Sequence, residues 1–381
     1  MNILHVTLSF SHGGRREAIA ELCRGLRAYG VVNRLCCVDE LEVEQGRLDN
    51  WFAESIELRR RGLFDRTALS RLRRFCRDRE IDIVHTHDAA SQAASVLAMP
   101  FAGPKMLMTF HRTRNFESAR VRDRVRNALA GLRGGAIVTA SEERRRHYIE
   151  TNHVATSKVR CIPLGIDLER FRPNPARRAL VRESLGLAPA QTVIGAVGHF
   201  GSEKGIDIAI DAFQHYVREH PGTDAHLVVL GAGSDAQERF VRSRIAQDMA
   251  GRIDFVGFQA HPEDWFPAFD LLLHGARSEA FGLVLVEAMA CGVPVAAAHV
   301  GGIPEIVEEG QSGSLAATPE AEPLAAALAN VLSSSRERAQ WSLAARERAC
   351  SAFGSARYAR QYFDLYSALL HRGASVARAS H

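Results

Sequence analysis

Short apolar runs alternate with stretches of helical periodicity along the whole chain. The runs that we expect to form strands are 3–8, 31–38, 81–85, 106–110, 136–140 and 159–162, then 192–197, 227–230, 253–256, 271–274 and 293–297. The stretches that we expect to form helices are 15–29, 67–79 and 142–150, then 204–217, 236–248, 283–291, 323–333, 336–351 and 356–370. Strands that alternate with helices are typical of β-α-β units, so the pattern predicts an α/β protein with parallel sheets.

The alternation is interrupted at residues 163–175, where three prolines and a glycine mark a connection. A chain of 381 residues is too long for one ordinary core. We therefore expect two doubly wound, Rossmann-like domains, residues 1–165 and 166–355, facing each other across a ligand cleft at the ends of both sheets. A C-terminal helix and tail at 356–381 should pack back toward the N-terminal domain through a stripe of aromatic residues, Tyr358, Tyr362, Phe363 and Tyr366.

Composition favours a globular protein, since 46% of the residues are hydrophobic and 24% are charged. No apolar run reaches the roughly 18 residues that a membrane span needs, and the N-terminus reads as a first strand rather than a signal peptide. The seven cysteines show no C-x-x-C spacing, which favours reduced thiols and a cytoplasmic location. A net charge of +4 is too small to imply nucleic acid.

Positive charge is concentrated in one segment of the first half. Its arginines are Arg112, Arg114, Arg120, Arg122, Arg124, Arg126 and Arg133, and Arg144, Arg145 and Arg146 follow. One interpretation is a solvated helix face. The other is a surface for a phosphorylated acceptor or for anionic lipid at the inner face of the cell membrane.

The most informative stretch runs from Ser278 to Val295 and contains the acids Glu279 and Glu287. Glu287 is the only acid between Phe281 and Ala298, and burying a lone carboxylate in an apolar run requires hydrogen bonds. Glu279 precedes a predicted helix start and Glu287 lies about one turn inside that helix. The free N–H groups of the helix start attract phosphate. Two acids that accept hydroxyl hydrogens around an anion site suit a sugar-nucleotide pocket.

Lys204 lies where a strand passes into a helix, in the loop that begins at Gly198. A lysine at a helix start opposes the helix dipole, so structure alone disfavours it there. It becomes favourable if Lys204 and the helix N-terminus both face a phosphate.

Two other motifs offer different chemistry. Gly231 and Gly233 follow a strand and match G-x-G-x-x-[GA], and Asp254 comes roughly where a ribose-binding acid would lie, so dinucleotide binding stays open. His85 and His87 alternate at a strand end and share one face, which admits a metal site. No further cluster with ligand spacing accompanies them, so we expect no metal and assign both to the lining of a cleft.

Gly13 and Gly14 follow the first strand, and His111 ends another strand. Glycines allow close approach of a ligand, and a histidine at a strand end can bind a sugar hydroxyl. No G-x-S-x-G nucleophile elbow and no D-x-D motif for a diphosphate-bound cation is present.

Together these residues resemble the family 4 glycosyltransferases, retaining enzymes of the GT-B fold. The resemblance is carried by Glu279, Phe281-Gly282 and Glu287 with the segments 288–295 and 301–307. Weaker matches in the expected order are Gly13-Gly14, 82–87, 109–111, 138–141, 162–167, Lys204-Gly205 and Gly231 with Gly233. The chain departs from the family pattern at His199, where arginine is common, at Ala280, where glycine is common, and at Gly275-Ala276, where Pro-Ser is common.

The resemblance implies roles for individual residues. Glu279, His111 and Lys204 would be catalytic, and the donor would be bound by Gly14, His199, Lys204, Phe258, Glu279, Phe281, Gly282, Leu283 and Glu287. The acceptor or a membrane surface would meet Arg112, Arg114, Arg120 and Arg124. Within these sets, Glu287 would hold the ribose, Phe258 would lie near the base, and His111 would sit by the transferred sugar.

The function predicted is a retaining glycosyltransferase that moves a sugar from a nucleoside-diphosphate sugar to a glycan or lipid-linked acceptor, in polysaccharide or lipopolysaccharide synthesis. No cofactor and no obligatory metal is expected. The alternatives are an NAD-dependent oxidoreductase built on Gly231, and a non-catalytic protein that binds a sugar nucleotide.

Overall fold

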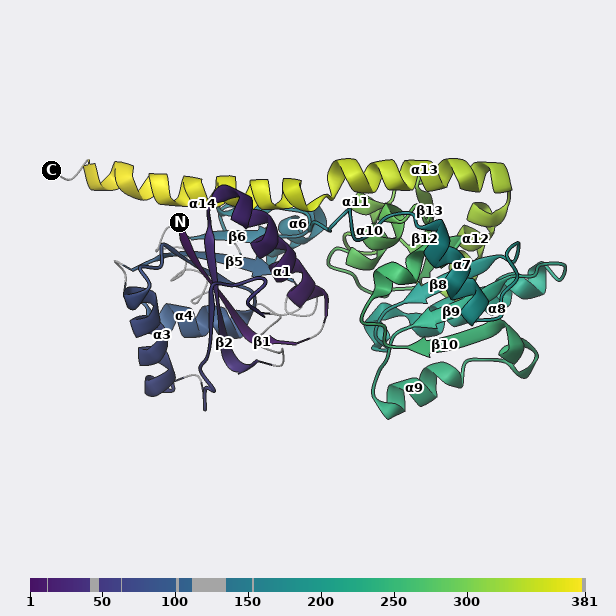
Figure 1. The fold of residues 1–381 in the computed structure, drawn as a ribbon, viewed down its shortest axis with the longest axis horizontal. Coiled ribbons are helices and arrows are strands. Elements are labelled where there is room, and N and C mark those ends of the chain that lie inside the picture. The colour runs from purple at the N-terminus through teal and green to yellow at the C-terminus, as the bar shows by residue number, and fades with distance from the viewer. Residues whose placement is uncertain are drawn as a thin grey trace. The chain divides into compact units, whose positions relative to one another are not determined.

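The computed structural model describes residues 1–11, 13–41, 48–62, 64–100, 103–111, 135–152 and 154–378, with side chains to residue 371. The chain divides into two compact units (Figure 1). Unit 1 is formed by Met1–Gly165 together with Ser355–His381, and unit 2 by Ile166–Gly354.

Unit 1 is built on a seven-stranded parallel sheet in the order β3-β2-β1-β4-β5-β6-β7. Its strands are β1 (Asn2–Phe10), β2 (Val32–Leu41), β3 (Glu54–Glu57), β4 (Ile83–Thr86), β5 (Lys105–Phe110), β6 (Ala136–Thr139) and β7 (Val159–Cys161). Its described helices are α1 (Gly14–Leu26), α3 (Arg66–Asp78), α4 (Ala89–Ala98), α6 (Glu142–Asn152) and α14 (Ser355–Arg378), with short 3-10 turns at Arg27–Tyr29 and Thr156–Lys158.

Unit 2 repeats this plan with a six-stranded parallel sheet in the order β10-β9-β8-β11-β12-β13. Its strands are β8 (Val193–Val197), β9 (His226–Leu230), β10 (Ile253–Gly257), β11 (Leu271–His274), β12 (Val295–Ala298) and β13 (Gly313–Ala316). Its helices are α7 (Pro175–Ser184), α8 (Ile206–Glu219), α9 (Asp235–Arg242), α10 (Leu283–Ala290), α11 (Ile303–Ile306), α12 (Ala321–Leu332) and α13 (Ser335–Ala352). Its 3-10 turns are Ser202–Lys204, Gln247–Arg252, Pro262–Asp264 and Phe266–Ala268.

In both sheets the strand order reverses next to the first strand, which is the doubly wound arrangement with helices on both faces. Central strands such as β9, β11 and β12 are buried along their whole length. A strand that is covered on both faces has a continuous run of apolar residues. This explains why the apolar runs in the sequence marked the positions of these strands. The predicted α/β fold class is confirmed.

Several predicted elements need correction. The helix expected at 236–248 ends at Arg242, and a 3-10 turn occupies Gln247–Arg252. The expected connection at 163–175 ends at α7, which begins at Pro175 behind an Asn174 side chain that accepts the Arg177 N–H. The short strands β3 and β13 and the helix α4 were not predicted.

The C-terminal helix α14 packs against α1 of unit 1, as predicted (Figure 1). Tyr358, Tyr362 and Tyr366 are buried. The Tyr366 hydroxyl lies 2.7 Å from His85 Nδ1, and the Tyr362 hydroxyl lies 2.7 Å from Thr109 Oγ1. Phe363 stacks on Tyr29 at a centroid separation of 4.6 Å. The aromatic stripe is therefore a packing surface that also supplies hydrogen bonds to the sheet.

Within the described part of the chain, no helix has both the length and the apolar character required to cross a bilayer. All seven cysteines are free thiols, and five of them are buried.

The crossing of α1 and α14 generates a prediction. In a free helix, Gly25→Ala would stabilise by roughly 0.5–1 kcal/mol. Here the added Cβ would lie 2.6 Å from Ala359 Cβ. We therefore expect Gly25→Ala to destabilise the protein by about 1–3 kcal/mol, the usual effect of overpacking, in urea unfolding. Combining it with Ala359→Gly should recover most of the loss, whereas an unchanged loss in the double variant would contradict this packing.

Candidate functional site

The loops that follow β8 and β11 are neighbours because these two strands pair where the strand order of unit 2 reverses. In doubly wound sheets, ligands bind outside the carboxyl ends of the strands at this switch point. The first loop carries His199 and Lys204, and the second carries Glu279 and leads into α10. The fold therefore brings together the two sequence segments that carry most of the predicted donor-binding residues.

Backbone contacts hold these two loops together. Gly205 has φ +61°, and a side chain there would place its Cβ 1.8 Å from the carbonyl oxygen of Gly275. The Arg277 guanidinium donates to Asp207 at 2.6 Å and to the carbonyl of Ser202 at 2.7 Å. The Arg277 N–H also donates to the Glu203 carbonyl at 3.0 Å. The loop of Lys204 is thus tied on both sides to the segment that precedes Glu279.

A partly buried ion pair is the centre of the site. Lys204 Nζ lies 2.6 Å from Glu279 Oε2, and His274 Nε2 lies 3.5 Å from the same oxygen. Glu279 is only 8% exposed and His274 is buried at the end of β11. Burial by itself raises the pKa of Glu279, but Lys204 and His274 outweigh it and hold that pKa well below its usual range. Glu279 is therefore a carboxylate at neutral pH.

The backbone of Glu279 is anchored from a third loop. The Gly302 N–H donates to the Glu279 carbonyl at 3.2 Å. Gly301 has φ +55°, and a Cβ there would lie 1.8 Å from the same oxygen. Gly301 and Gly302, which begin one of the segments that carry the family resemblance, thus allow the backbone to approach Glu279 closely.

The helix α10 begins directly after this pair, with Gly282 as its N-cap at φ +111°. The Leu285 and Val286 N–H groups donate to the Gly282 carbonyl at 3.0 and 3.4 Å, and the N–H groups before them have no acceptor within the helix, as at every helix start. Glu287 lies about one turn inside α10 and is partly exposed. The Phe281 ring is buried against Phe353, with ring centroids 5.7 Å apart, so its backbone rather than its ring is available to a ligand.

The remaining predicted donor residues are either exposed in unit 2 or part of unit 1. His199 is exposed, and its Nδ1 accepts the Gly201 N–H at 3.1 Å while its Nε2 lies 3.5 Å from Glu203. Phe258 follows β10 and is 59% exposed. Gly14 begins α1 and His111 follows β5, and both belong to unit 1.

Sequence reasoning missed His274. The sequence pattern placed His274 in a strand and gave it no role, although a histidine at the end of a central strand, five residues before Glu279, was a usable signal. Its Nε2 is buried and has no well-oriented hydrogen-bond partner among the described residues, so the oxygen of Glu279 at 3.5 Å is its nearest electrostatic contact.

The geometry contradicts the dinucleotide interpretation of Gly231 and Asp254. Asp254 is the second residue of β10 and pairs with His226 at 2.9 Å, at the start of β9. Gly231 follows the other end of β9, so Asp254 lies at the edge of the sheet opposite to the glycine turn. A Cβ at Gly231 would lie 1.9 Å from the Gly198 carbonyl oxygen, which shows that this turn packs against another loop.

His85 and His87 do share one face, with ring centroids 4.1 Å apart, but the expectation that both line a cleft is wrong. His85 is fully buried and contacts Tyr366 and Thr109. His5 joins them, and the three residues offer ligand atoms within 4.8 Å of one another. Each ring nitrogen of the three already has a hydrogen-bond partner, so a metal ion would have to displace these bonds.

The predicted acceptor or membrane residues Arg112, Arg114, Arg120 and Arg124 lie outside the described residues, as do Arg122, Arg126 and Arg133. Of the arginines that follow, Arg144 pairs with Glu143 at 2.8 Å and Arg145 with Glu142 at 3.0 Å.

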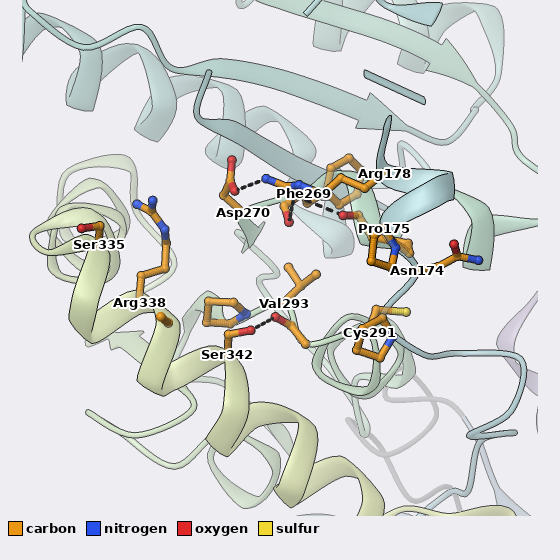
Figure 2. Close-up of a pocket in the computed structure, with 15 residues that line it drawn as sticks. Asn174, Pro175, Arg178, Phe269, Asp270, Cys291, Val293, Ser335, Arg338 and Ser342 are labelled. Atoms are coloured by element: carbon orange, nitrogen blue, oxygen red, sulfur yellow. Dashed lines mark hydrogen bonds and ion pairs between the residues drawn. The ribbon is translucent and has the colours of Figure 1, made fainter. Parts of the chain in front are cut away.

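Unit 2 also contains a cavity of about 370 Å³ at the opposite edge of its sheet. Asp270 and Pro294, which line it, directly precede β11 and β12. Figure 2 shows Arg178 directed at Asp270, and their side chains are 2.7 Å apart. This cavity is separate from the site of Lys204 and Glu279, because the two lie at opposite ends of β11.

Comparisons with known proteins agree with this geometry. Residues 178–348 match the family model described as glycosyl transferases group 1, and residues 12–170 match glycosyltransferase family 4. The D-inositol 3-phosphate glycosyltransferase 2 of Catenulispora acidiphila is 30% identical over 308 residues, covering 75% of this chain and 70% of the relative. The chain belongs to glycosyltransferase family 4.

Solved structures support the same fold for this family 4 glycosyltransferase. A glycosyltransferase from Rickettsia africae aligns with a TM-score of 0.84 at 20% identity, covering 97% of this chain and 98% of that one. HepE of Anabaena, solved with UDP and glucose, aligns with a TM-score of 0.81 at 20% identity, covering 97% and 100%. The predicted family and the GT-B fold class are confirmed, and the NAD-dependent oxidoreductase alternative falls away.

The ion pair generates a prediction about pH. We expect Lys204→Met to destabilise the protein by about 1–3 kcal/mol at neutral pH, because Glu279 would remain charged without its nearest cation. In the variant, burial raises the pKa of Glu279, so its folded state takes up a proton more readily than the unfolded state. Wild-type Glu279 has a lowered pKa and loses its stabilising contribution on acidification. The free-energy difference between wild type and variant should therefore shrink from about pH 7 to about pH 4.

Chemical unfolding at several pH values measures this difference. Lys158→Met is the matched control, since Lys158 is exposed and its loss should change stability by less than about 0.5 kcal/mol. A difference between wild type and Lys204→Met that is independent of pH would contradict the pairing of Lys204 with Glu279.

Proposed function

We propose that this enzyme is a retaining glycosyltransferase whose donor is a nucleoside-diphosphate sugar bound at the switch point of unit 2. The observation that carries the proposal is the close pairing of Lys204 and Glu279 immediately before the N-terminus of α10. The Lys204 ammonium and the start of α10 can bind a diphosphate. The Glu279 carboxylate beside them can accept hydrogen bonds from hydroxyl groups.

Lys204 is the residue proposed to neutralise the leaving diphosphate. An ammonium has three donors, so Lys204 can bind a phosphate oxygen while it keeps its contact with Glu279. The N–H groups at the start of α10, after Gly282, add further donors for the phosphates. Donors fixed in position before reaction stabilise charge that develops on the leaving group.

The two glutamates are proposed to hold hydroxyl groups. Glu279 is ionised and can only accept hydrogen bonds, which suits the transferred sugar. Glu287, one turn further along α10, is proposed to accept from the ribose hydroxyls. This arrangement distinguishes the sugar end from the nucleoside end of the donor.

The donor is proposed to carry uridine diphosphate, because HepE, which shares the fold, was solved with UDP and glucose. The acceptor is proposed to be a hydroxyl of a phosphorylated or lipid-linked glycan, in keeping with a relative named for inositol 3-phosphate. A role in polysaccharide or lipopolysaccharide synthesis is part of the same proposal.

Retention of configuration is proposed to follow from attack by the acceptor on the face from which the diphosphate leaves. An oxygen of the leaving diphosphate would take the proton of the acceptor hydroxyl, so this step needs no side-chain base. Charge stabilisation by Lys204 and the start of α10 would replace an obligatory metal ion.

Contact with an anionic membrane is proposed for the arginine-rich segment, which lies outside the described residues. Clustered arginines attract anionic lipid by about 1 kcal/mol each near the surface. This proposal places the enzyme in the cytoplasm at the inner face of the cell membrane.

The donor site predicts a selective response to nucleotides. In a thermal-shift screen of UDP, GDP, ADP, their sugar conjugates and NAD, we expect UDP compounds to raise the melting temperature. Lys204→Ala and Glu287→Ala should each weaken UDP binding by at least about tenfold, because charged hydrogen bonds are lost. Binding should persist with EDTA.

Lys158→Ala is the control for the binding measurements. In a separate turnover assay with the donor identified in the screen, NMR should show that the product retains the anomeric configuration of that donor. Binding of NAD alone would contradict the donor site, inversion would contradict the mechanism, and donor binding without turnover would favour a non-catalytic role.

The membrane proposal predicts salt-sensitive binding to vesicles that contain anionic phospholipid. Reversing the charge of Arg120, Arg122, Arg124 and Arg126 to glutamate should abolish cosedimentation with these vesicles while leaving UDP binding unchanged. Neutral vesicles are the control. Equal binding of the variant and the wild type would rule out this surface.

A further inference from the structure

A row of hydrogen bonds crosses unit 1 from β2 to the end of β5 and joins four side chains. Asn33 Oδ1 lies 3.1 Å from His5 Nε2, and His5 Nδ1 lies 3.0 Å from His87 Nε2. His87 Nδ1 lies 3.0 Å from His111 Nε2. Asn33, His5 and His87 are buried, and the strands that carry the row, β2, β1, β4 and β5, are direct neighbours in the sheet.

The direction of every hydrogen bond in this row is set by Asn33. Its Nδ2 donates to the Cys23 carbonyl at 3.2 Å, and a carbonyl can only accept. The amide oxygen therefore faces His5 and accepts from Nε2–H. A neutral imidazole has one N–H and one lone pair, so His5 Nδ1 must accept from His87 Nε2–H. In the same way His87 Nδ1 accepts from His111 Nε2–H.

The imidazoles in this row are neutral. Burial lowers the pKa of His5 to about 4, against a smaller opposing effect of its bond to Asn33. Burial, together with the nearby Arg15, lowers the pKa of His111 to about 3. Burial also lowers the pKa of His87, and the neighbouring His85, His111, His5 and Arg15 lower it further.

One consequence concerns His111. With its proton on Nε2, its Nδ1 carries a lone pair, and that atom is shielded from solvent without a hydrogen-bond partner among the described residues. A buried acceptor without a donor is unfavourable, so a ligand that donates a hydrogen bond at this point would be favoured.

We propose that Asn33, His5 and His87 are positioning residues that hold His111 in the tautomer with a bare Nδ1, so that His111 accepts a hydrogen bond from a substrate hydroxyl. The inference rests on the proposed function, which supplies a sugar hydroxyl from the donor or from the acceptor. It assigns a direction to that contact: the hydroxyl donates and His111 accepts. A group that can only accept, such as fluorine, would meet a lone pair and be rejected.

The tautomer is measured without substrate. In long-range ¹H–¹⁵N spectra of the complete protein labelled at histidine, at about pH 8 where histidine is neutral, His111 should show protonated Nε2 and unprotonated Nδ1. His220 is an internal control of opposite sense, because its Nδ1 faces the Tyr216 carbonyl at 2.9 Å and must donate. His111→Gln assigns the signal. A protonated Nδ1 on His111 would overturn the proposal whether or not the protein binds a donor.

Variants of His87 separate positioning from folding. His87→Gln keeps one donor for His5 and one acceptor for His111, so it should preserve the tautomer and the activity within about twofold. His87→Leu removes both groups, and His111 should then populate both tautomers with kcat/KM reduced roughly tenfold, the effect of about one hydrogen bond. An equal loss of kcat/KM in both variants, or an unchanged His111 tautomer in His87→Leu, would contradict the positioning role of this row.

Substrate analogues test the direction of the contact in the wild-type enzyme. Deoxy and deoxyfluoro forms of the UDP-sugar, and separately of the acceptor, identify which partner supplies the hydroxyl. At that position the fluoro compound should lose as much kcat/KM as the deoxy compound, roughly tenfold or more. A fluoro compound that reacts as well as the parent at every position would overturn the proposal, even with the donor site intact.

Discussion

The reversal of strand order inside each sheet determines where polar side chains can gather in this protein. A parallel sheet brings the carboxyl ends of its strands to one edge, and only where the order reverses do two adjacent loops diverge to opposite faces and leave room for a ligand. In unit 2 this place holds an ion pair between Lys204 and Glu279. In unit 1 a row of neutral histidines begins inside the sheet, at Asn33 and His5, and reaches the carboxyl edge at His87 and His111.

The ion pair of unit 2 and the histidine row of unit 1 stabilise buried polar side chains in different ways. Glu279 stays charged because the Lys204 ammonium lies 2.6 Å away. The histidines of the row, His5, His87 and His111, stay uncharged because burial opposes protonation, and each nitrogen between Asn33 and His111 is matched to a donor or an acceptor. A neutral row can transmit orientation across a core where a charge would be too unfavourable.

Much of the candidate site in unit 2 was predictable because many of its residues lie within one short segment. Glu279, Gly282 and Glu287 fall within about two turns of chain, so local spacing places them at one helix start. Lys204 was recognisable because its charge is unfavourable where it stands. The row from Asn33 to His111 depends on which strands pair, and local sequence does not contain that information.

The errors in the predicted elements have similar causes. Residues 236–248 keep a helical pattern, but the chain leaves the helix at Ser243, whose hydroxyl donates to the Phe240 carbonyl at 2.7 Å. The prolines near 173–175 suggested a loop, yet Pro175 occupies the first turn of α7, where its missing N–H has no consequence. The overlooked strands β3 (Glu-Ser-Ile-Glu) and β13 (Gly-Ser-Leu-Ala) contain polar or small residues, so they lack the apolar run that marked the other four-residue strands.

The position of α14 has a consequence for how this protein is made. His85 is completed by the hydroxyl of Tyr366, a residue 281 positions later in the chain, and Thr109 contacts Tyr362 in the same helix. Unit 2 is a continuous segment, whereas unit 1 needs both the beginning and the end of the chain. During synthesis on the ribosome, unit 1 therefore begins before unit 2 and can be completed only after it. The histidine-rich core of unit 1 stays incomplete until α14 is made, whereas unit 2 already has all of its residues by then.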